Sequence, residues 1–167
     1  MMYQICYLFT YAMIKFEQTN QGIIMGKSFG STLECSDERI DALMNEYVRQ
    51  LDSKSRVKAG DVFNRIVECP CSRFWVSGFR AAVVVAGIMK GDDLSTMRPL
   101  KREMFYEIYN RVIKLKEKYP DHSLFKLASM AVLQPAPKFY LSPSSAKIMY
   151  YKAKREWYRK RIEALKG

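Results

Sequence analysis

Histidine and paired cysteine are scarce in this sequence. The 167 residues include one histidine, His122, and four cysteines, of which only Cys69 and Cys71 lie close together. A gap of one proline is not the usual zinc spacing, and no second cysteine pair completes a ligand set. We therefore expect no metal site and no disulfide framework, as in a reduced, cytoplasmic protein.

Signatures of catalysis are also missing. The chain has no glycine-rich phosphate loop, no GxSxG elbow and no HExxH helix. His122 follows Pro120 and Asp121, a context that favours a surface or capping role over general-base catalysis. Asp92 and Asp93 indicate a solvated turn, because no second acidic cluster accompanies them. We expect no catalytic residues, no cofactor and no enzymatic activity.

No apolar run is long enough to span a bilayer. The N-terminal segment MMYQICYLFTYAMIKF is apolar and aromatic, but it is too short for a span and lacks the basic start of a signal peptide. Its alternation suits a strand or a buried segment. Alternatively, Met25 is the true start and residues 1–24 are an over-extended reading frame. Neither interpretation predicts contact with a membrane.

Positive charge is abundant, and it is concentrated at one end. The net charge is +11; residues 1–36 and 37–97 are each neutral, whereas residues 98–167 carry seventeen basic and six acidic residues. A local excess of this kind is the electrostatic footprint that phosphate binding requires. The sequence therefore predicts a nucleic-acid partner for the C-terminal segment.

Apolar residues at helical spacing predict an all-α protein. Proline, glycine and serine mark the boundaries: Pro99 opens one long helix, Gly91 stops the helix before it, and Ser142 with Pro143 opens the last. The predicted helices are 38–51, 60–69, 77–89, 99–118, 123–133 and 143–165.

Two parts of the chain resemble each other. CPCSRFWVSGFRA (residues 69–81) aligns with QPAPKFYLSPSSA (residues 134–146) at a constant shift of 65 positions, which matches Arg73 with Lys138 and Phe74 with Phe139. We therefore predict two related, helix-turn-helix-like units packed together. The division is an N-terminal extension over 1–36, a neutral repeat over 37–97 and a basic repeat over 98–167.

The basic repeat is the predicted binding unit. In a helix-turn-helix arrangement, helix 123–133 supports helix 143–165, which enters the major groove of DNA. The face opposite the expected core residues contains residues suited to phosphate and base contacts, with a basic residue just before the helix. The candidates are Lys138, Ser144, Ser145, Lys147, Tyr151, Lys154, Arg155 and Arg159.

The matching helix of the neutral repeat is apolar on every side. SGFRAAVVVAGIMKG (residues 77–91) carries charge only at Arg80 and Lys90. Such a helix is buried, either as the central core helix of one domain or against a partner. Residues 77–90 are therefore a candidate homo-oligomer interface.

The pattern PAPKFYLSPSSAKIM followed by KAKREWYRKR resembles small basic helix-turn-helix-like proteins of bacterial phages and mobile elements. The resemblance covers residues 120–160 and implies DNA binding in regulation or element maintenance. The link from Pro135 to Leu141 departs from it, because it exceeds the usual short turn.

Together these features predict a non-catalytic protein that contacts duplex DNA through its basic C-terminal helix. Two alternatives stay open. One is an RNA-binding or ribosome-associated protein, because a basic helix with tyrosines also suits RNA. The other is a phage structural or assembly protein, with the apolar helix as its oligomer interface.

Overall fold

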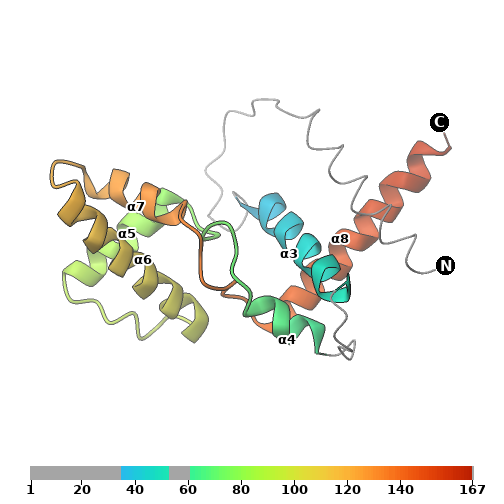
Figure 1. Cartoon of the computed structure of the whole chain (residues 1–167), viewed down its shortest axis with the longest axis horizontal. Helices are drawn as coiled ribbons and strands as arrows, with labels where there is room; N and C mark the ends of the chain where they lie inside the picture. Colours follow the sequence, from blue (N-terminus) through green and yellow to red (C-terminus); the bar gives the residue numbers. More distant parts are fainter. Residues whose placement is uncertain (1–34, 53–60, 167) are drawn as a thin grey trace.

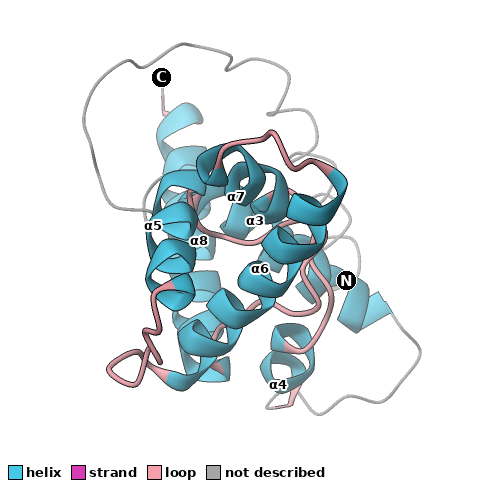
Figure 2. Ribbon diagram, turned by 90° about the vertical axis from the view of Figure 1, so that its left-hand side faces the viewer, coloured by secondary structure: helices cyan, strands magenta, loops and turns pink. Residues whose placement is uncertain are grey.

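A computed structural model describes residues 35–52 and 61–166 of the chain. These residues form helices and loops, with one isolated β-bridge and no strand (Figure 2). The all-α prediction is confirmed. The helices are α3 (Ser36–Asp52), α4 (Val62–Val67), α5 (Gly78–Met89), α6 (Pro99–Lys118), α7 (Leu124–Val132) and α8 (Pro143–Ala164). The segment 1–34 and its predicted strand or buried stretch lie outside the described residues.

Local signals define the ends of these helices. Ser77, Ser123 and Ser142 precede α5, α7 and α8, and each side chain accepts a hydrogen bond from a backbone N–H three residues later. At the other end of α5, Gly91 has a φ of +103°. Its N–H donates to Ile88 and the N–H of Asp92 donates to Gly87, so the helix ends in a Schellman motif. The predicted start and stop residues are confirmed.

The helices pack in two lobes (Figure 1). The α5 lobe contains α5, α6 and α7, and the α8 lobe contains α3, α4 and α8. Each lobe thus takes helices from both the 37–97 and the 98–167 segments. The prediction that residues 123–133 support the following helix is wrong, since α7 packs on α5 and α6 while α4 and α3 hold α8.

Two links run from one lobe to the other, and they explain why each lobe contains helices of both segments. The first link (residues 68–77) joins α4 to α5, and the second (residues 133–142) joins α7 to α8. Paired backbone hydrogen bonds hold the crossing, and the donors and acceptors correspond at a separation of 65 positions. The bonds are Cys71 N–H to Ala136 O (3.0 Å), Ala136 N–H to Cys71 O (2.9 Å), Phe74 N–H to Val132 O (2.9 Å) and Phe139 N–H to Val67 O (3.1 Å).

Each link also inserts an aromatic side chain into the core. Phe74 is fully buried and Phe139 nearly so. The guanidinium of Arg111 lies 4.7 Å from the centre of the Phe74 ring, and the same side chain donates to the carbonyl of Pro135 in the second link (2.6 Å). Arg111 on α6 therefore ties the two links together at the centre of the molecule.

None of the helices in the described part of the chain has the length and apolarity that a membrane span requires.

Replacing either buried phenylalanine of the links by alanine should destabilise the whole fold. We expect Phe74→Ala and Phe139→Ala each to lower the free energy of unfolding by about 3–5 kcal/mol, because each removes a buried ring and leaves a cavity. The measurement is urea denaturation followed by circular dichroism.

Phe79→Ala is the matched control, because Phe79 is 69% exposed on α5. It should change the free energy of unfolding by no more than about 0.5 kcal/mol. Equal losses of stability at Phe74 and Phe79 would contradict the role assigned to the links.

Candidate nucleic-acid interface

Helix α8 begins at a well-formed N-terminus. Ser142 caps it and Pro143 occupies the first turn, as the sequence predicts. The Ser142 hydroxyl accepts the N–H of Ser145 (3.2 Å) and donates to the Ser145 hydroxyl (2.8 Å), and it lies 3.1 Å from that of Ser144. The first turn therefore presents a small cluster of hydroxyl groups beside N–H groups that carry partial positive charge.

One side of α8 is buried against α3 and α4. Ala146 and Tyr150 are almost completely shielded from solvent. The Tyr150 ring stacks on Tyr47 of α3 with a centroid distance of 4.1 Å and meets the edge of Phe63 of α4 at 5.6 Å. Trp157 is half-buried about two turns further along, which marks the end of the packed region. These contacts fix the rotation of α8 and therefore the direction of its other face.

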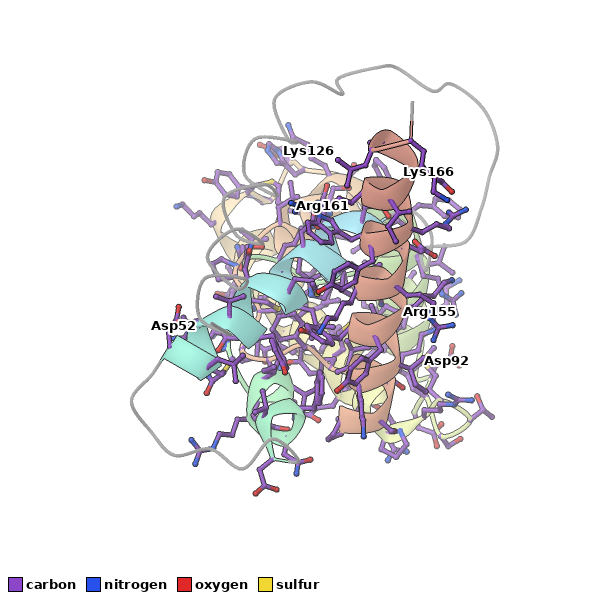
Figure 3. The ribbon with its side chains drawn as sticks, turned by 90° about the vertical axis from the view of Figure 1, so that its right-hand side faces the viewer. Asp52, Asp92, Lys126, Arg155, Arg161 and Lys166 are labelled. Carbon is purple, nitrogen blue, oxygen red and sulfur yellow. The ribbon has the colours of Figure 1, made fainter. Side chains whose placement is uncertain are left out.

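That other face, the outward face of α8, carries most of the predicted binding residues. Its exposed members are Ser144, Lys147, Tyr151, Lys152, Arg155 and Arg159. Lys154 is half-buried at the margin of the face. In Figure 3, Arg155 lies on the side of α8 away from α3, whereas Arg161 lies on the side toward it. The sequence analysis missed Lys152, although its spacing from Arg155 and Arg159 places it on the same surface.

Few acidic groups neutralise this helix. Residues 143–164 contain seven basic and two acidic residues. Arg159 lies 4.0 Å from Glu163, a long contact between two exposed side chains. Within the described residues, no ion pair involves Lys147, Lys152, Lys154 or Arg155. These cations can therefore approach an external polyanion without first breaking an internal pair.

Lys138 is the one predicted residue that lies outside α8. It belongs to the second link, and its ammonium group lies 2.8 Å from Glu103 of α6 and 3.9 Å from Glu68. The hydrogen bond with Glu103 raises the pKa of Lys138. Arg73, its counterpart in the first link, contacts Glu38 of α3 at 3.1 Å. Both link cations thus anchor a link to a long helix.

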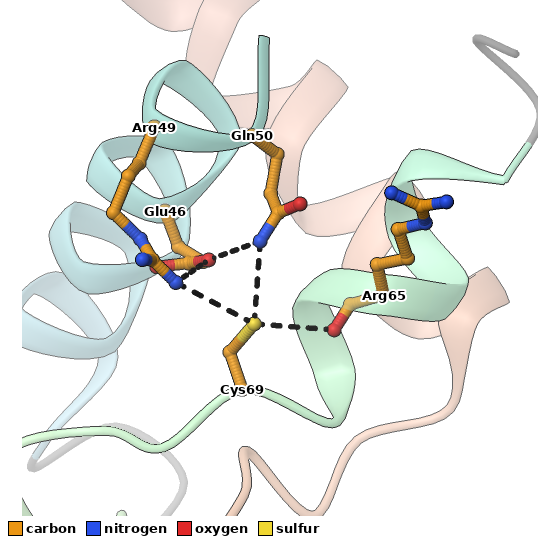
Figure 4. Close-up of polar contacts among 5 residues, drawn as sticks. All are labelled: Glu46, Arg49, Gln50, Arg65 and Cys69. Atoms are coloured by element: carbon orange, nitrogen blue, oxygen red, sulfur yellow. Dashed lines mark hydrogen bonds and ion pairs between the residues drawn. The ribbon is translucent and has the colours of Figure 1, made fainter. Parts of the chain in front are cut away.

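Cys69 of the first link forms a polar cluster with α3 (Figure 4). Arg49 and Gln50 both donate to Glu46 at 2.7 Å, and Gln50 also donates to the Cys69 sulfur at 3.4 Å. The Cys69 thiol in turn donates to the Arg65 carbonyl at 3.3 Å. Burial, followed by the hydrogen bond with Glu46, raises the pKa of Cys69. The cluster joins α3 to the end of α4 and favours a protonated thiol.

Cys71 is buried beneath the same link. Its thiol donates to the carbonyls of Arg73 (3.3 Å) and Lys138 (3.4 Å), one from each link. Burial raises the pKa of Cys71 to about 11. In the described part of the chain, no three His, Cys, Asp or Glu side chains gather in a group that could hold a metal ion.

Helix α5 is buried on part of its surface only, whereas the sequence predicted burial on every side. Ala81, Val84 and Val85 are buried in the core, so part of its surface is internal. Phe79 and Val83 are exposed, at 69% and 46%. An oligomer formed through residues 77–90 would use these two side chains. The matching positions of α8 at a shift of 65 are Ser144 and Ile148.

Comparison of this chain with protein-family models, with curated proteins and with solved structures finds no match.

The raised thiol pKa values predict slow alkylation at neutral pH. We expect Cys69 and Cys71 to react with iodoacetamide far more slowly than an unfolded peptide thiol at about pH 7.5, because only the thiolate is nucleophilic. Mass spectrometry of tryptic peptides reports each cysteine separately. Labelling of Cys71 should become rapid only as the pH approaches about 11.

The same shift affects stability. A thiol whose pKa is raised by folding stabilises the native state below the unfolded value of 9.0, and that contribution is lost as the pH rises toward about 11. Rapid labelling of Cys71 at neutral pH in the folded protein would contradict this assignment.

Proposed function

We propose that this chain is a non-catalytic DNA-binding protein that contacts duplex DNA through the outward face of α8. The observation that supports it most is the row of exposed cations on α8 that have no acidic partner among the described residues. Helix N-termini and Lys or Arg side chains are the groups that most often contact phosphate. An exposed helix with a packed rear face also has the geometry in which helices enter a major groove.

The interface in this proposal comprises Ser144, Ser145, Lys147, Tyr151, Lys154, Arg155 and Arg159, together with Lys152. Lys138 is left out because Glu103 holds it at 2.8 Å. The helices that support α8 are α3 and α4. The helix-turn-helix-like unit therefore combines α3 and α4 of the first segment with α8 of the second segment. The resemblance to proteins of phages and mobile elements favours a regulatory role.

We further infer that residues 37–97 and 98–167 are two copies of one unit of three helices. The first copy contains α3, α4 and α5, and the second contains α6, α7 and α8. The two copies have exchanged their last helices, α5 and α8. The bonds between the links support this, because Cys71 pairs with Ala136 and each bond has a counterpart 65 positions away. The serine caps at Ser77 and Ser142 and the pairs Arg73–Glu38 and Lys138–Glu103 correspond in the same way. On this view, α5 and α8 occupy corresponding places, and only α8 is basic.

Charge reversal on α8 tests the proposal. We expect Lys147→Glu with Lys154→Glu to weaken binding to a duplex oligonucleotide by at least about 100-fold, because two attractive phosphate contacts become repulsive. The dependence of log affinity on log salt should become shallower by about 2 units, at about 0.9 for each phosphate that the protein ceases to neutralise. Fluorescence anisotropy over a range of salt concentrations measures both quantities.

Lys114→Glu with Lys116→Glu is the matched control. Both residues are exposed on α6 in the other lobe, and the change in net charge is the same. Duplex affinity should fall by less than about 5-fold, through the long-range field alone. Equal weakening in both double variants would show that binding depends on net charge and would overturn the assignment to α8. Stronger binding to single-stranded RNA than to duplex DNA would favour the RNA alternative.

Lys138 should behave as a structural residue. We expect Lys138→Ala to leave duplex affinity within about 2-fold of the wild-type value and the salt slope unchanged, since its ammonium is paired with Glu103 of α6. The free energy of unfolding should fall by about 1 kcal/mol or less, because one partner of the pair is largely exposed. A salt slope that is shallower by about one unit would return Lys138 to the interface.

A further inference from the structure

A second pattern on α8 is apolar. Ile148, Tyr151, Tyr158, Ile162 and Leu165 are all exposed, and Ile148, Ile162 and Leu165 keep 69%, 52% and 80% of their surface. Their spacing alternates between three and four residues, with Arg155 at the one remaining position. This spacing places side chains in a narrow stripe along one side of a helix, as at the a and d positions of a coiled coil. We call these six residues the α8 seam.

The residues that flank the seam are all basic. On one side, at the g positions, are Lys147, Lys154 and Arg161, and on the other, at the e positions, are Lys152, Arg159 and Lys166. Five of the six are exposed, and Lys154 is half-buried. In a coiled coil these positions face those of the partner helix and determine which partners are accepted. An apolar stripe between two rows of cations favours a partner helix whose flanking residues are acidic.

The C-terminal end of the seam, formed by Ile162 and Leu165, is exposed to solvent. Beyond Trp157, residues 158–166 are exposed on all sides, and α8 extends past α3 and α4 (Figure 1). A second helix can therefore lie along α8 there without displacing α3 or α4.

A second copy of this chain does not fit the seam. In a parallel pair of helices, e residues face g residues, and in an antiparallel pair, residues of like position face each other. Since all six flanking residues are basic, either orientation places cations against cations. Like-charge juxtaposition disfavours pairing, whereas acidic flanks on a partner helix would pair at every position.

We propose that the α8 seam docks an amphipathic helix of another protein, with apolar residues at its contact positions and Glu or Asp at the flanking positions. Arg155, the one charged residue in the seam, pairs with an acidic residue of that helix and sets the register. The proposal goes beyond DNA binding. The two surfaces share six residues, so the acidic helix and duplex DNA exclude each other; these are Lys147, Tyr151, Lys152, Lys154, Arg155 and Arg159.

The probe is a fluorescent peptide of about three heptads, with Leu or Ile at a and d, Glu at e and g, and one Glu placed opposite Arg155. A control peptide carries Lys at e and g. We expect the full chain to bind the acidic peptide at least about 10-fold more tightly than the basic one, as measured by anisotropy. Unlabelled acidic peptide should release bound duplex DNA.

Two double variants separate this proposal from the DNA-binding proposal on which the competition rests. Ile162→Ser with Leu165→Ser removes exposed apolar groups and no charge, so the fold and duplex affinity should be unchanged, whereas peptide affinity should fall by at least about 10-fold. Lys147→Glu with Lys154→Glu should weaken both. Circular dichroism verifies that both variants remain helical.

The two proposals can fail separately. Duplex binding without binding of the acidic peptide overturns the seam proposal alone, and peptide binding without duplex binding overturns the DNA proposal alone. Equal affinity for the two peptides removes the charge argument and overturns the seam proposal. Self-association at micromolar concentration that is abolished by Ile162→Ser with Leu165→Ser also overturns the seam proposal. Binding to anionic vesicles in place of the acidic peptide overturns it as well.

Discussion

Cys71 and Ala136 exchange backbone hydrogen bonds of 3.0 and 2.9 Å where the two proline-containing links cross, and this contact determines which helices pack together. Buried backbone N–H and C=O groups need partners, and the crossing supplies them from the other link (Cys71 with Ala136) or from the last residue of the helix before it (Val132 and Val67). Once the links are paired, α5 leaves the crossing toward α6 and α7, and α8 leaves it toward α3 and α4. The position of the basic helix therefore follows from a contact that contains no basic residue.

The helices themselves could be predicted from sequence because their signals are local. Ser142 with Pro143, Pro99 and Gly91 act within one turn of the residue concerned, and the predicted and observed ends of α6 coincide. Apolar residues at helical spacing on α6 and α8 include the buried residues Phe105, Ile108 and Tyr150. Such periodicity shows which face of a helix is buried, and it does not show which neighbour covers that face. For this reason the sequence predicts α7 beneath α8, where the structure has α4 and α3.

The candidate site could be predicted in part, for the same reason. Charge and periodicity were sufficient to select Lys147, Tyr151 and Arg155, which share the outward face of α8. They could not predict the ion pair of Lys138, because its partner Glu103 is 35 positions away and belongs to another helix. They also could not distinguish the seam from the buried face, because apolar residues recur at helical spacing on both sides of α8. Two apolar patterns coexist on this helix, and only the packing of Tyr150 shows which of them is internal.

Helices α5 and α8 differ on surfaces that take no part in the crossing. The groups that hold the crossing are backbone atoms, two buried phenylalanines and two ion pairs, and their equivalents occur in both segments. The outward faces of α5 and α8 take no part in these contacts, and exposed substitutions typically change stability by about 0.5 kcal/mol or less. The same architecture can therefore carry the exposed apolar residues Phe79 and Val83 on α5 and a row of cations on α8. Because α8 also extends beyond the core (Figure 1), its exposed surface suits both proposed partners, a polyanion and an acidic helix, and the two proposals share Lys147 and Lys154.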